Sequence, residues 1–171
     1  MSRHFWLIRH AKSAWPPNVA DMDRPLGERG HSDGQTMSKI FATYPHQPQL
    51  WITSDALRTQ QTVELLNCDL KTPIQLNHAL YMATEFKVRG VLNSIDPEVS
   101  CVAITTHMPT IQRSANYFAD ERSRAKLPSK YSTLCMLCFE ISCPWEALDF
   151  GMASVVDTFL PRDFRDKQQT L

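Results

Sequence analysis

Short, almost continuous apolar runs constrain the fold of this chain more than any other feature. The runs are residues 5–8, 49–53, 101–106 and 134–141, and segments with helical spacing of apolar residues lie between them. Strands that are apolar on both faces belong to parallel sheets with helices on each side. We therefore predict an α/β fold of three layers: a doubly wound, mostly parallel central sheet flanked by helices.

Four amphipathic helices are predicted between these strands. They cover residues 30–44, a segment for which Ser54 is the predicted N-cap, residues 84–95 and a segment that starts near Pro109. A brief extended segment at 74–76 and a strand at 154–160 complete the predicted elements. No repeat, low-complexity tract or Gly/Ser linker divides the chain of 171 residues. We expect a single domain over residues 1–160 and a polar C-terminal tail over 161–171.

The composition excludes several classes of protein. Lys plus Arg and Asp plus Glu number 18 each, so the charge balance indicates neither a nucleic-acid-binding nor an acidic disordered chain. No apolar stretch approaches the roughly 20 residues of a membrane helix, and no long apolar region of a signal peptide is present. We expect a cytoplasmic protein without a nucleic-acid or membrane partner. No feature points to a particular oligomeric state.

The cysteines are expected to be buried free thiols in a reducing compartment. Their number, five, is odd, and they lie among apolar residues. Cys135 and Cys138 form a C-x-x-C, but the surrounding LCMLCFEI has the pattern of a strand. A redox or zinc site needs that pair at a helix start or beside a second ligand pair. We therefore interpret both as core residues and predict no metal or cofactor.

Cationic side chains follow three of the predicted strands. Arg9 and His10 come directly after the first strand, Arg58 lies in the first turn of the helix after the second, and His107 follows the third. The carboxyl ends of parallel strands meet at one edge of the sheet, where the helix N-termini bind anions. Guanidinium groups match pairs of phosphoryl oxygens. The pattern predicts a phosphate site.

The predicted neighbours of His10 favour a nucleophilic imidazole. Two arginines within about 4 to 6 Å lower the pKa of a histidine, which is normally near 6.5. A neutral His10, with one ring nitrogen held by a backbone carbonyl, would attack phosphorus and form a phosphohistidine that water hydrolyses. Arg9, Arg58 and a protonated or hydrogen-bonding His107 would stabilise the phosphoryl oxygens.

Two other kinds of site fit the pattern poorly. A zinc site needs several neutral histidines or thiolates, and paired arginines would repel the ion. A serine hydrolase of the common α/β type needs G-x-S-x-G, which the sequence lacks.

These residues carry a resemblance to a known family. LIRHAKSAW, DMDRPLGERG, ITSDALRTQQT, ALYMAT and AITTHMPT, in this order, resemble the histidine phosphatase superfamily, the phosphoglycerate-mutase-like enzymes. The likeness covers roughly residues 4–135. The D-x-x-R-P-L-x-x-x-G segment, from Asp21 to Gly30, and KLPSKYSTLCML resemble the small single-domain phosphohistidine phosphatases of bacterial two-component signalling. The resemblance implies a protein-dephosphorylating hydrolase that needs no metal.

The resemblance also implies roles for individual residues. His10 is the implied nucleophile, Arg9 and Arg58 the implied phosphate ligands, and His107 completes the pocket. The family often has Gly before the second histidine, where this chain has Thr106. The family's general acid is often a Glu after the short third strand. Here His78 stands near that place and Glu85 lies farther on, and both are candidates.

Arg24 and Ser13, in the segment after the first predicted strand, are candidates for substrate binding. Arg24 either reaches the phosphate or pairs with Asp21 or Asp23 to hold its loop. Ser13 lies beside the predicted pocket and has a hydroxyl that can donate to a phosphoryl oxygen.

The length between the catalytic segments bears on the substrate. Only 48 residues separate Arg58 from His107, too few for a large capping subdomain. An open groove suits a phosphorylated protein, such as a histidine phosphotransfer domain, better than a small phosphoester, which normally needs enclosure. Two alternatives are a phosphomutase, which needs a lid against water, and a catalytically idle phosphate-binding or phosphoprotein-binding module.

Overall fold

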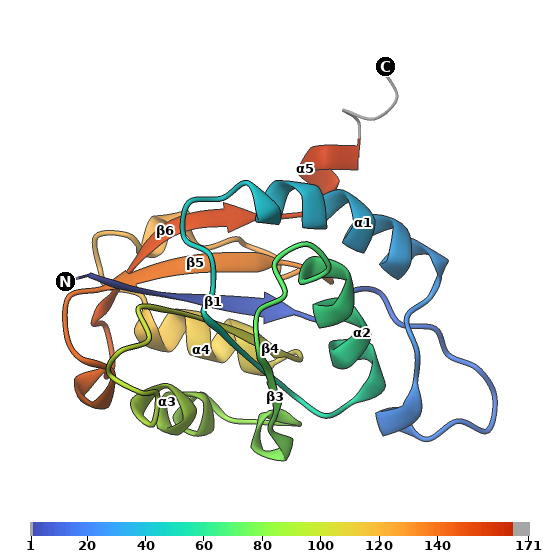
Figure 1. Ribbon diagram of the computed structural model, residues 1–171, viewed down its shortest axis with the longest axis horizontal. Coiled ribbons are helices and arrows are strands. Elements are labelled where there is room, and N and C mark those ends of the chain that lie inside the picture. The colour runs from blue at the N-terminus through green and yellow to red at the C-terminus, as the bar shows by residue number, and fades with distance from the viewer. Residues whose placement is uncertain (1, 166–171) are drawn as a thin grey trace.

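The structure is a computed structural model that describes residues 2–165. Strands and helices alternate along most of the chain (Figure 1). The elements are β1 (Arg3–Arg9), α1 (Glu28–Ala42), β2 (Leu50–Thr53), α2 (Leu57–Leu66), β3 (Ile74–Leu76), α3 (Glu85–Asn93), β4 (Cys101–Thr106), α4 (Thr110–Phe118), β5 (Met136–Ile141), β6 (Ala153–Phe159) and α5 (Arg162–Arg165).

A six-stranded sheet with the order β3-β2-β4-β1-β5-β6 forms the middle layer. The first four of these strands pair in parallel, and β5 and β6 join antiparallel beside β1. Helices α1 and α2 cover one face, and α3 and α4 cover the other (Figure 1). The predicted three-layer, mostly parallel α/β fold is confirmed. Between Arg58 and His107 lie only the rest of α2, β3, a short turn, α3 and β4, so no large capping subdomain is present.

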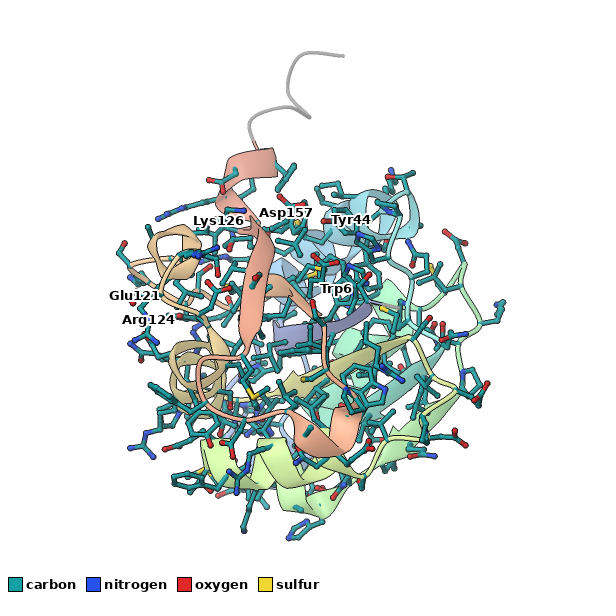
Figure 2. All side chains as sticks on the ribbon, turned by 90° about the vertical axis from the view of Figure 1, so that its left-hand side faces the viewer. Trp6, Tyr44, Glu121, Arg124, Lys126 and Asp157 are labelled. Carbon is teal, nitrogen blue, oxygen red and sulfur yellow. The ribbon has the colours of Figure 1, made fainter. Side chains whose placement is uncertain are left out.

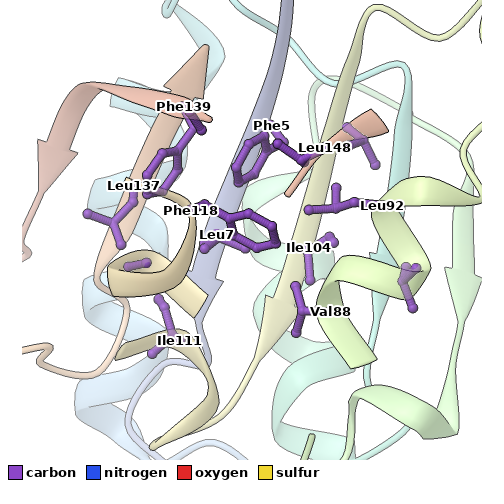
Figure 3. Packing of buried hydrophobic residues seen from close by; sticks show 14 of the residues in the cluster. Phe5, Leu7, Val88, Leu92, Ile104, Ile111, Phe118, Leu137, Phe139 and Leu148 are labelled. Atoms are coloured by element: carbon purple, nitrogen blue, oxygen red, sulfur yellow. The ribbon is translucent and has the colours of Figure 1, made fainter. Parts of the chain in front are cut away.

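Helices bury both faces of β1 in its middle, which explains the apolar run at residues 5–8. Phe5 and Leu7 lie in the cluster under α3 and α4, as Figure 3 shows, whereas Trp6 and Ile8 lie in the cluster under α1 and α2. All four side chains are fully buried. The ring of Phe5 stacks on Phe139 of β5 at a centroid distance of 4.8 Å. This packing fixes the end of β1, where the cationic side chains begin.

The cluster under α1 and α2 extends to β6, at the antiparallel edge of the sheet. Trp6 meets the edge of Phe41 of α1 at 4.9 Å between ring centroids. Tyr44, just past α1, contacts Trp6 and donates a hydrogen bond to Asp157 of β6. Figure 2 shows Trp6, Tyr44 and Asp157 on the same side of the molecule. The end of α1 is therefore fixed against both β1 and β6.

One predicted helix start is wrong. Helix α2 begins at Leu57, and its N-cap is Ala56, which has no side-chain capping bond. Ser54 lies earlier, where β2 has just ended, and its backbone N–H donates to the carbonyl oxygen of Thr105. The Ser54 hydroxyl accepts from the N–H of Ala56 at 3.4 Å but does not cap α2. The other predicted boundaries lie within about two residues of the observed ones, as is usual at frayed element ends.

The segment predicted as a polar tail begins with α5. Arg165 pairs with Asp33 of α1 at 2.7 Å, and Phe164 lies against Phe159 at 6.2 Å between ring centroids. Residues 166–171 lie outside the described part of the chain.

The cysteines are all free, and most are buried as expected. Cys101, Cys135 and Cys138 lie in the core, and Cys143 is half-buried, but Cys68 is exposed, contrary to the expectation. Cys68 follows α2 in a turn, where no element covers it. None of the helices in residues 2–165 has the length and apolar character needed to span a bilayer.

Gly30 lets α1 approach the loop after β1. A Cβ atom at this position would lie 2.2 Å from the backbone carbonyl oxygen of Lys12. We expect Gly30→Ala to lower the free energy of unfolding by about 1–3 kcal/mol, because the backbone of one segment must move. The measurement is urea denaturation.

A second helical glycine supplies the matched control. A Cβ atom added to Gly90 in α3 would meet no neighbouring atom within 4 Å. Gly90→Ala should therefore raise the free energy of unfolding by about 0.5–1 kcal/mol through helix propensity. Equal effects of the two substitutions would contradict a close approach at Gly30.

Candidate active site

The sheet order places the three cationic segments side by side. In the sheet, β4 lies between β2 and β1, and His107, Ser54 and His10 follow these strands. The backbone N–H of His10 donates to the carbonyl oxygen of Thr106 at 3.1 Å, which holds the first segment against the third. A cavity of about 280 Å³ lies at this edge. Its lining residues are Arg9, His10, Lys12, Ser13, Trp15, Asp21, Arg24, Arg58, Met82, His107, Met108 and Thr133.

His10 is oriented as a neutral nucleophile. Its Nδ1 lies 2.7 Å from the carbonyl oxygen of Ala11, which can only accept, so Nδ1 carries the proton and Nε2 keeps its lone pair. Burial lowers the pKa of His10 to about 4, and Arg58, Arg9 and Arg24 add to this effect. The Ala11 N–H in turn donates to the hydroxyl of Thr62, so the residue whose carbonyl orients the ring is itself fixed. His10 is therefore uncharged at neutral pH.

His107 lies beside His10, with 5.3 Å between their ring centroids. Arg58 Nη2 lies 3.3 Å from His107 Nδ1, and a guanidinium can only donate, so Nδ1 accepts. Nε2 then carries the proton and donates to the hydroxyl of Ser54 at 2.9 Å. Burial, and then the charges of His10 and Arg58, lower the pKa of His107 to about 3. The structure thus holds His107 neutral and hydrogen-bonded, the second of the two predicted states.

The arginines predicted from the sequence meet at the cavity. Arg9 Nη1 donates to the carbonyl oxygen of Tyr131 at 2.6 Å, and its buried Nε has no hydrogen-bond partner among the described residues. Arg58 donates to the backbone and side-chain oxygens of Asp21 at 2.5 and 2.9 Å. Arg24 pairs with Asp21, which is one of its two predicted interpretations, and it also lines the cavity, so its contact with the phosphate stays a prediction. Its Nη2 donates to the Ser13 hydroxyl at 2.5 Å.

Asp21 connects these cations and was not predicted to line the site. Its carboxylate accepts hydrogen bonds from Tyr81, Arg24 and Arg58 at 2.7–2.9 Å. The Tyr81 hydroxyl, and then the two arginines, hold the pKa of Asp21 well below its usual range. The carboxylate is therefore ionised at neutral pH. Asp21 could have been predicted at the site, because it begins the D-x-x-R-P-L segment. Nothing in the sequence around Tyr81 indicates its contact with Asp21.

Neither general-acid candidate lies at the cavity. His78 Nδ1 pairs with Asp55 at 2.8 Å, and 75% of its side chain is exposed. Glu85 is the first residue of α3 and is partly exposed at the surface. In the described part of the chain, Asp21 is the only carboxylate that lines the cavity. Within residues 2–165, no group of three or more His, Cys, Asp or Glu side chains is arranged to hold a metal ion.

The depressed histidine pKa values predict an acid-labile fold. Unfolded imidazoles titrate near 6.5, whereas His10 and His107 titrate at about 4 and about 3 in the folded protein. Below pH 6.5 the unfolded chain binds protons that the folded chain does not. The free energy of unfolding therefore decreases as the pH is lowered through this window. We expect a loss of about 2–5 kcal/mol between pH 7 and pH 4.5, measured by urea denaturation. If the histidines cause this loss, His107→Gln should lose less stability over the same pH range. A urea midpoint of the unmodified protein that does not change with pH would contradict the lowered histidine pKa values.

The fold and the site together define a class of protein. Two neutral imidazoles and three guanidinium groups surround a small cavity at the carboxyl edge of an α/β sheet. This arrangement binds a tetrahedral oxyanion and offers it a nitrogen nucleophile, which is the chemistry of a phosphoryl-transfer enzyme.

Comparisons with known proteins agree with this class. The family model of the histidine phosphatase superfamily (branch 1) matches residues 5–81. An uncharacterised protein of Mycobacterium tuberculosis is 28% identical over 161 residues, which cover 91% of this chain and 100% of that protein. A candidate phosphohistidine phosphatase SixA from Agrobacterium tumefaciens is 25% identical, with a TM-score of 0.79, over 93% of this chain and 98% of that one.

A structure of the protein histidine phosphatase SixA with tungstate shares the fold. Its TM-score is 0.80 at 18% identity, over 95% of this chain and 99% of that one. Residues 5–81 therefore match the histidine phosphatase superfamily, and the whole chain has the fold of the small single-domain SixA structures. This match supports phosphatase activity.

Proposed function

We propose that the protein hydrolyses phosphoryl groups attached to nitrogen, above all phosphohistidine in a protein, through a covalent intermediate on His10. The observation that carries this proposal is the combination of a prepared nucleophile with a cavity whose lining carboxylate cannot supply a proton. His10 Nε2 has its lone pair available, and Asp21 is held ionised by Tyr81 and two arginines. Leaving-group chemistry then selects the substrate.

In the first step His10 replaces the leaving group on phosphorus. The Nε2 lone pair forms the new bond, and the bond from phosphorus to the substrate nitrogen breaks, with its electron pair leaving on that nitrogen. Water then attacks phosphorus, the Nε2–P bond breaks, and its electron pair returns to His10. Both protons of that water end on the released phosphate, which leaves as dihydrogen phosphate. Nδ1 keeps its proton throughout, because the Ala11 carbonyl oxygen holds it at 2.7 Å.

The surrounding cations bind the phosphoryl oxygens. Arg9 has a buried Nε without a hydrogen-bond partner in residues 2–165, and Arg58 is 4% exposed, so both offer desolvated donors. Such donors stabilise charge strongly because little water competes with them. Arg24 and Ser13 form a second, hydrogen-bonded pair at the same cavity. A phosphoryl dianion beside His107 raises the pKa of that imidazole, which can then take up a proton and donate it to an oxygen.

Phosphohistidine suits a site without a protonated carboxyl. An alkoxide leaving group needs a proton from the enzyme, which in many phosphatases comes from a carboxylic acid. The imidazole of phosphohistidine can carry a proton on its other ring nitrogen before the reaction. It then leaves as neutral imidazole and needs no acid. The access to the site also fits a protein substrate, because no large subdomain covers the cavity.

The names of similar proteins support the same substrate class. One neighbour with the same fold is described as a candidate phosphohistidine phosphatase, and another is described as a protein histidine phosphatase. A histidine phosphotransfer domain is therefore the partner that we propose. The chemistry uses only the groups of the chain itself, in keeping with metal-independent hydrolysis.

The test compares phosphorylated substrates with one preparation of the protein. A histidine-phosphorylated phosphotransfer domain should be hydrolysed at least about 100-fold more efficiently than a phosphoserine peptide, and tungstate should inhibit by competing at the cavity. Faster turnover of a phosphomonoester metabolite would contradict the proposal. Tungstate binding without turnover of any substrate would identify a phosphate-binding module instead, and transfer between hydroxyls without phosphate release would identify a mutase.

A further inference from the structure

An apolar part of the cavity has no role in the chemistry described above. Trp15, Met82 and Met108 line it beside the arginines and histidines. Trp15 is 74% exposed and Met82 is 66% exposed. Single exposed apolar side chains are common, but exposed apolar side chains gathered beside polar groups mark ligand-binding or interaction sites. Trp15 comes from the loop after β1, and Met82 comes from the connection from β3 to α3.

Trp15 is held in place although its ring is exposed. The guanidinium carbon of Arg24 lies 3.1 Å from the centroid of the Trp15 ring, a cation–π contact. Arg24 itself is 7% exposed and donates to the carbonyl oxygen of Ala14 at 3.1 Å. The Ala14 N–H donates to the carbonyl oxygen of Pro25 at 2.9 Å, which fixes the backbone before the ring. Binding a ligand to this ring therefore costs little side-chain entropy.

Met82 also has a defined position. Its φ is 52°, a left-handed conformation that side-chain-bearing residues rarely adopt. The preceding residue, Tyr81, donates to Asp21, the same carboxylate that pairs with Arg24 and Arg58. Strained residues of this kind persist where the surrounding structure fixes them, and they cluster at ligand sites. The phosphate ligands and the apolar residues are thus joined through one carboxylate.

We propose that Trp15, together with Met82, forms a subsite for a planar ring attached directly to phosphorus. The proposal rests on the proposed function, in which that ring is the imidazole of phosphohistidine. A flat ring bound to a phosphoryl group among the arginines extends into the remaining cavity, which these apolar side chains line. Aromatic stacking and sulfur–aromatic contact both favour a ring over an alkyl chain there. Trp15 is therefore a specificity-determining residue.

A structural role for Trp15 predicts a different result. The ring also shields Arg24 from water, and losing that shield would weaken the binding of every phosphoryl ligand alike. A ring subsite instead affects only ligands that carry a ring. Paired ligands that differ in this one respect separate the two roles.

The test measures binding of phenylphosphonate and methylphosphonate by calorimetry, so that no turnover is needed. The unmodified protein should bind phenylphosphonate about fivefold to tenfold more tightly. Trp15→Ala should remove this preference and leave the affinity for methylphosphonate within about twofold of its original value. The matched control is Phe150→Ala, which removes an aromatic ring of 63% exposure that does not line the cavity. This variant should keep the preference.

The other outcomes overturn either the ring subsite or the phosphate site. A preference that survives Trp15→Ala, or an equal loss for both ligands, refutes the ring subsite. Equal binding of the two ligands by the unmodified protein also refutes the ring subsite but leaves the phosphate site intact. Failure of both ligands to bind, with tungstate failing as well, refutes the phosphate site of the proposed function.

Discussion

Replacing His10 by alanine is expected to lower the rate of phosphohistidine hydrolysis by at least about 1,000-fold. The substitution removes the one lone pair that the site prepares for attack on phosphorus, on the ring whose other nitrogen the Ala11 carbonyl oxygen holds. Losing the nucleophile of a covalent mechanism costs far more than losing a single hydrogen bond. The measurement is release of phosphate under single-turnover conditions.

The controls for His10→Ala separate catalysis from folding and binding. His31→Ala removes an exposed histidine of α1 and should leave the rate unchanged. Tungstate should still bind His10→Ala, because Arg9, Arg58 and Arg24 remain. A variant that retains more than about a tenth of the rate would show that another group attacks phosphorus.

The second large effect is expected at Arg58. Its guanidinium contacts both Asp21 and His107 and is almost completely buried. We expect Arg58→Ala to lower kcat/KM by about 100-fold to 1,000-fold, because a desolvated cation at the phosphoryl group is lost. Arg58→Lys should recover little of this, since an ammonium cannot make the paired contacts of a planar guanidinium.

The pH profile gives Arg58→Ala an independent readout. The positive charge of Arg58 helps to lower the pKa of both His10 and His107. Hydrolysis requires neutral His10, so kcat/KM of the unmodified protein should fall only as the pH approaches about 4. Without Arg58 this fall should begin at higher pH. Arg113→Ala, an exposed arginine of α4, is the matched control. An unchanged profile in Arg58→Ala would contradict the charge coupling.

The placement of the central residues could be predicted because it follows from local pattern. Apolar runs identify the strands, and a parallel sheet brings the ends of its strands to one edge. Arg9 is the last residue of β1, His10 and His107 come directly after β1 and β4, and Arg58 lies in the first turn of α2. Predicting the cavity required only that these strands be neighbours, as the order β2-β4-β1 shows them to be.

The remaining parts of the site depend on contacts that sequence spacing does not encode. Asp21 meets Tyr81 across 60 positions and Arg58 across 37. Ser54 is a residue type that often caps helices, and it lies where the sequence pattern places a helix start. Helix α2 begins later, at Leu57, and the Ser54 hydroxyl accepts a hydrogen bond from His107. His78 stands at a plausible position along the chain but is directed to Asp55 at the surface. Such long-range pairings are set by packing rather than by local propensity.

Trapping the phosphorylated enzyme decides whether His10 is the nucleophile. The protein is mixed with an excess of histidine-phosphorylated substrate, and the reaction is stopped with alkali within one turnover. The position of the phosphoryl group on the protein is then mapped by mass spectrometry and phosphorus NMR. We predict a phosphoryl group on Nε2 of His10, formed and lost at rates that match turnover, and absent from His10→Ala. A phosphoryl group on another residue, or steady hydrolysis with no phosphorylated enzyme, would contradict a covalent intermediate on His10.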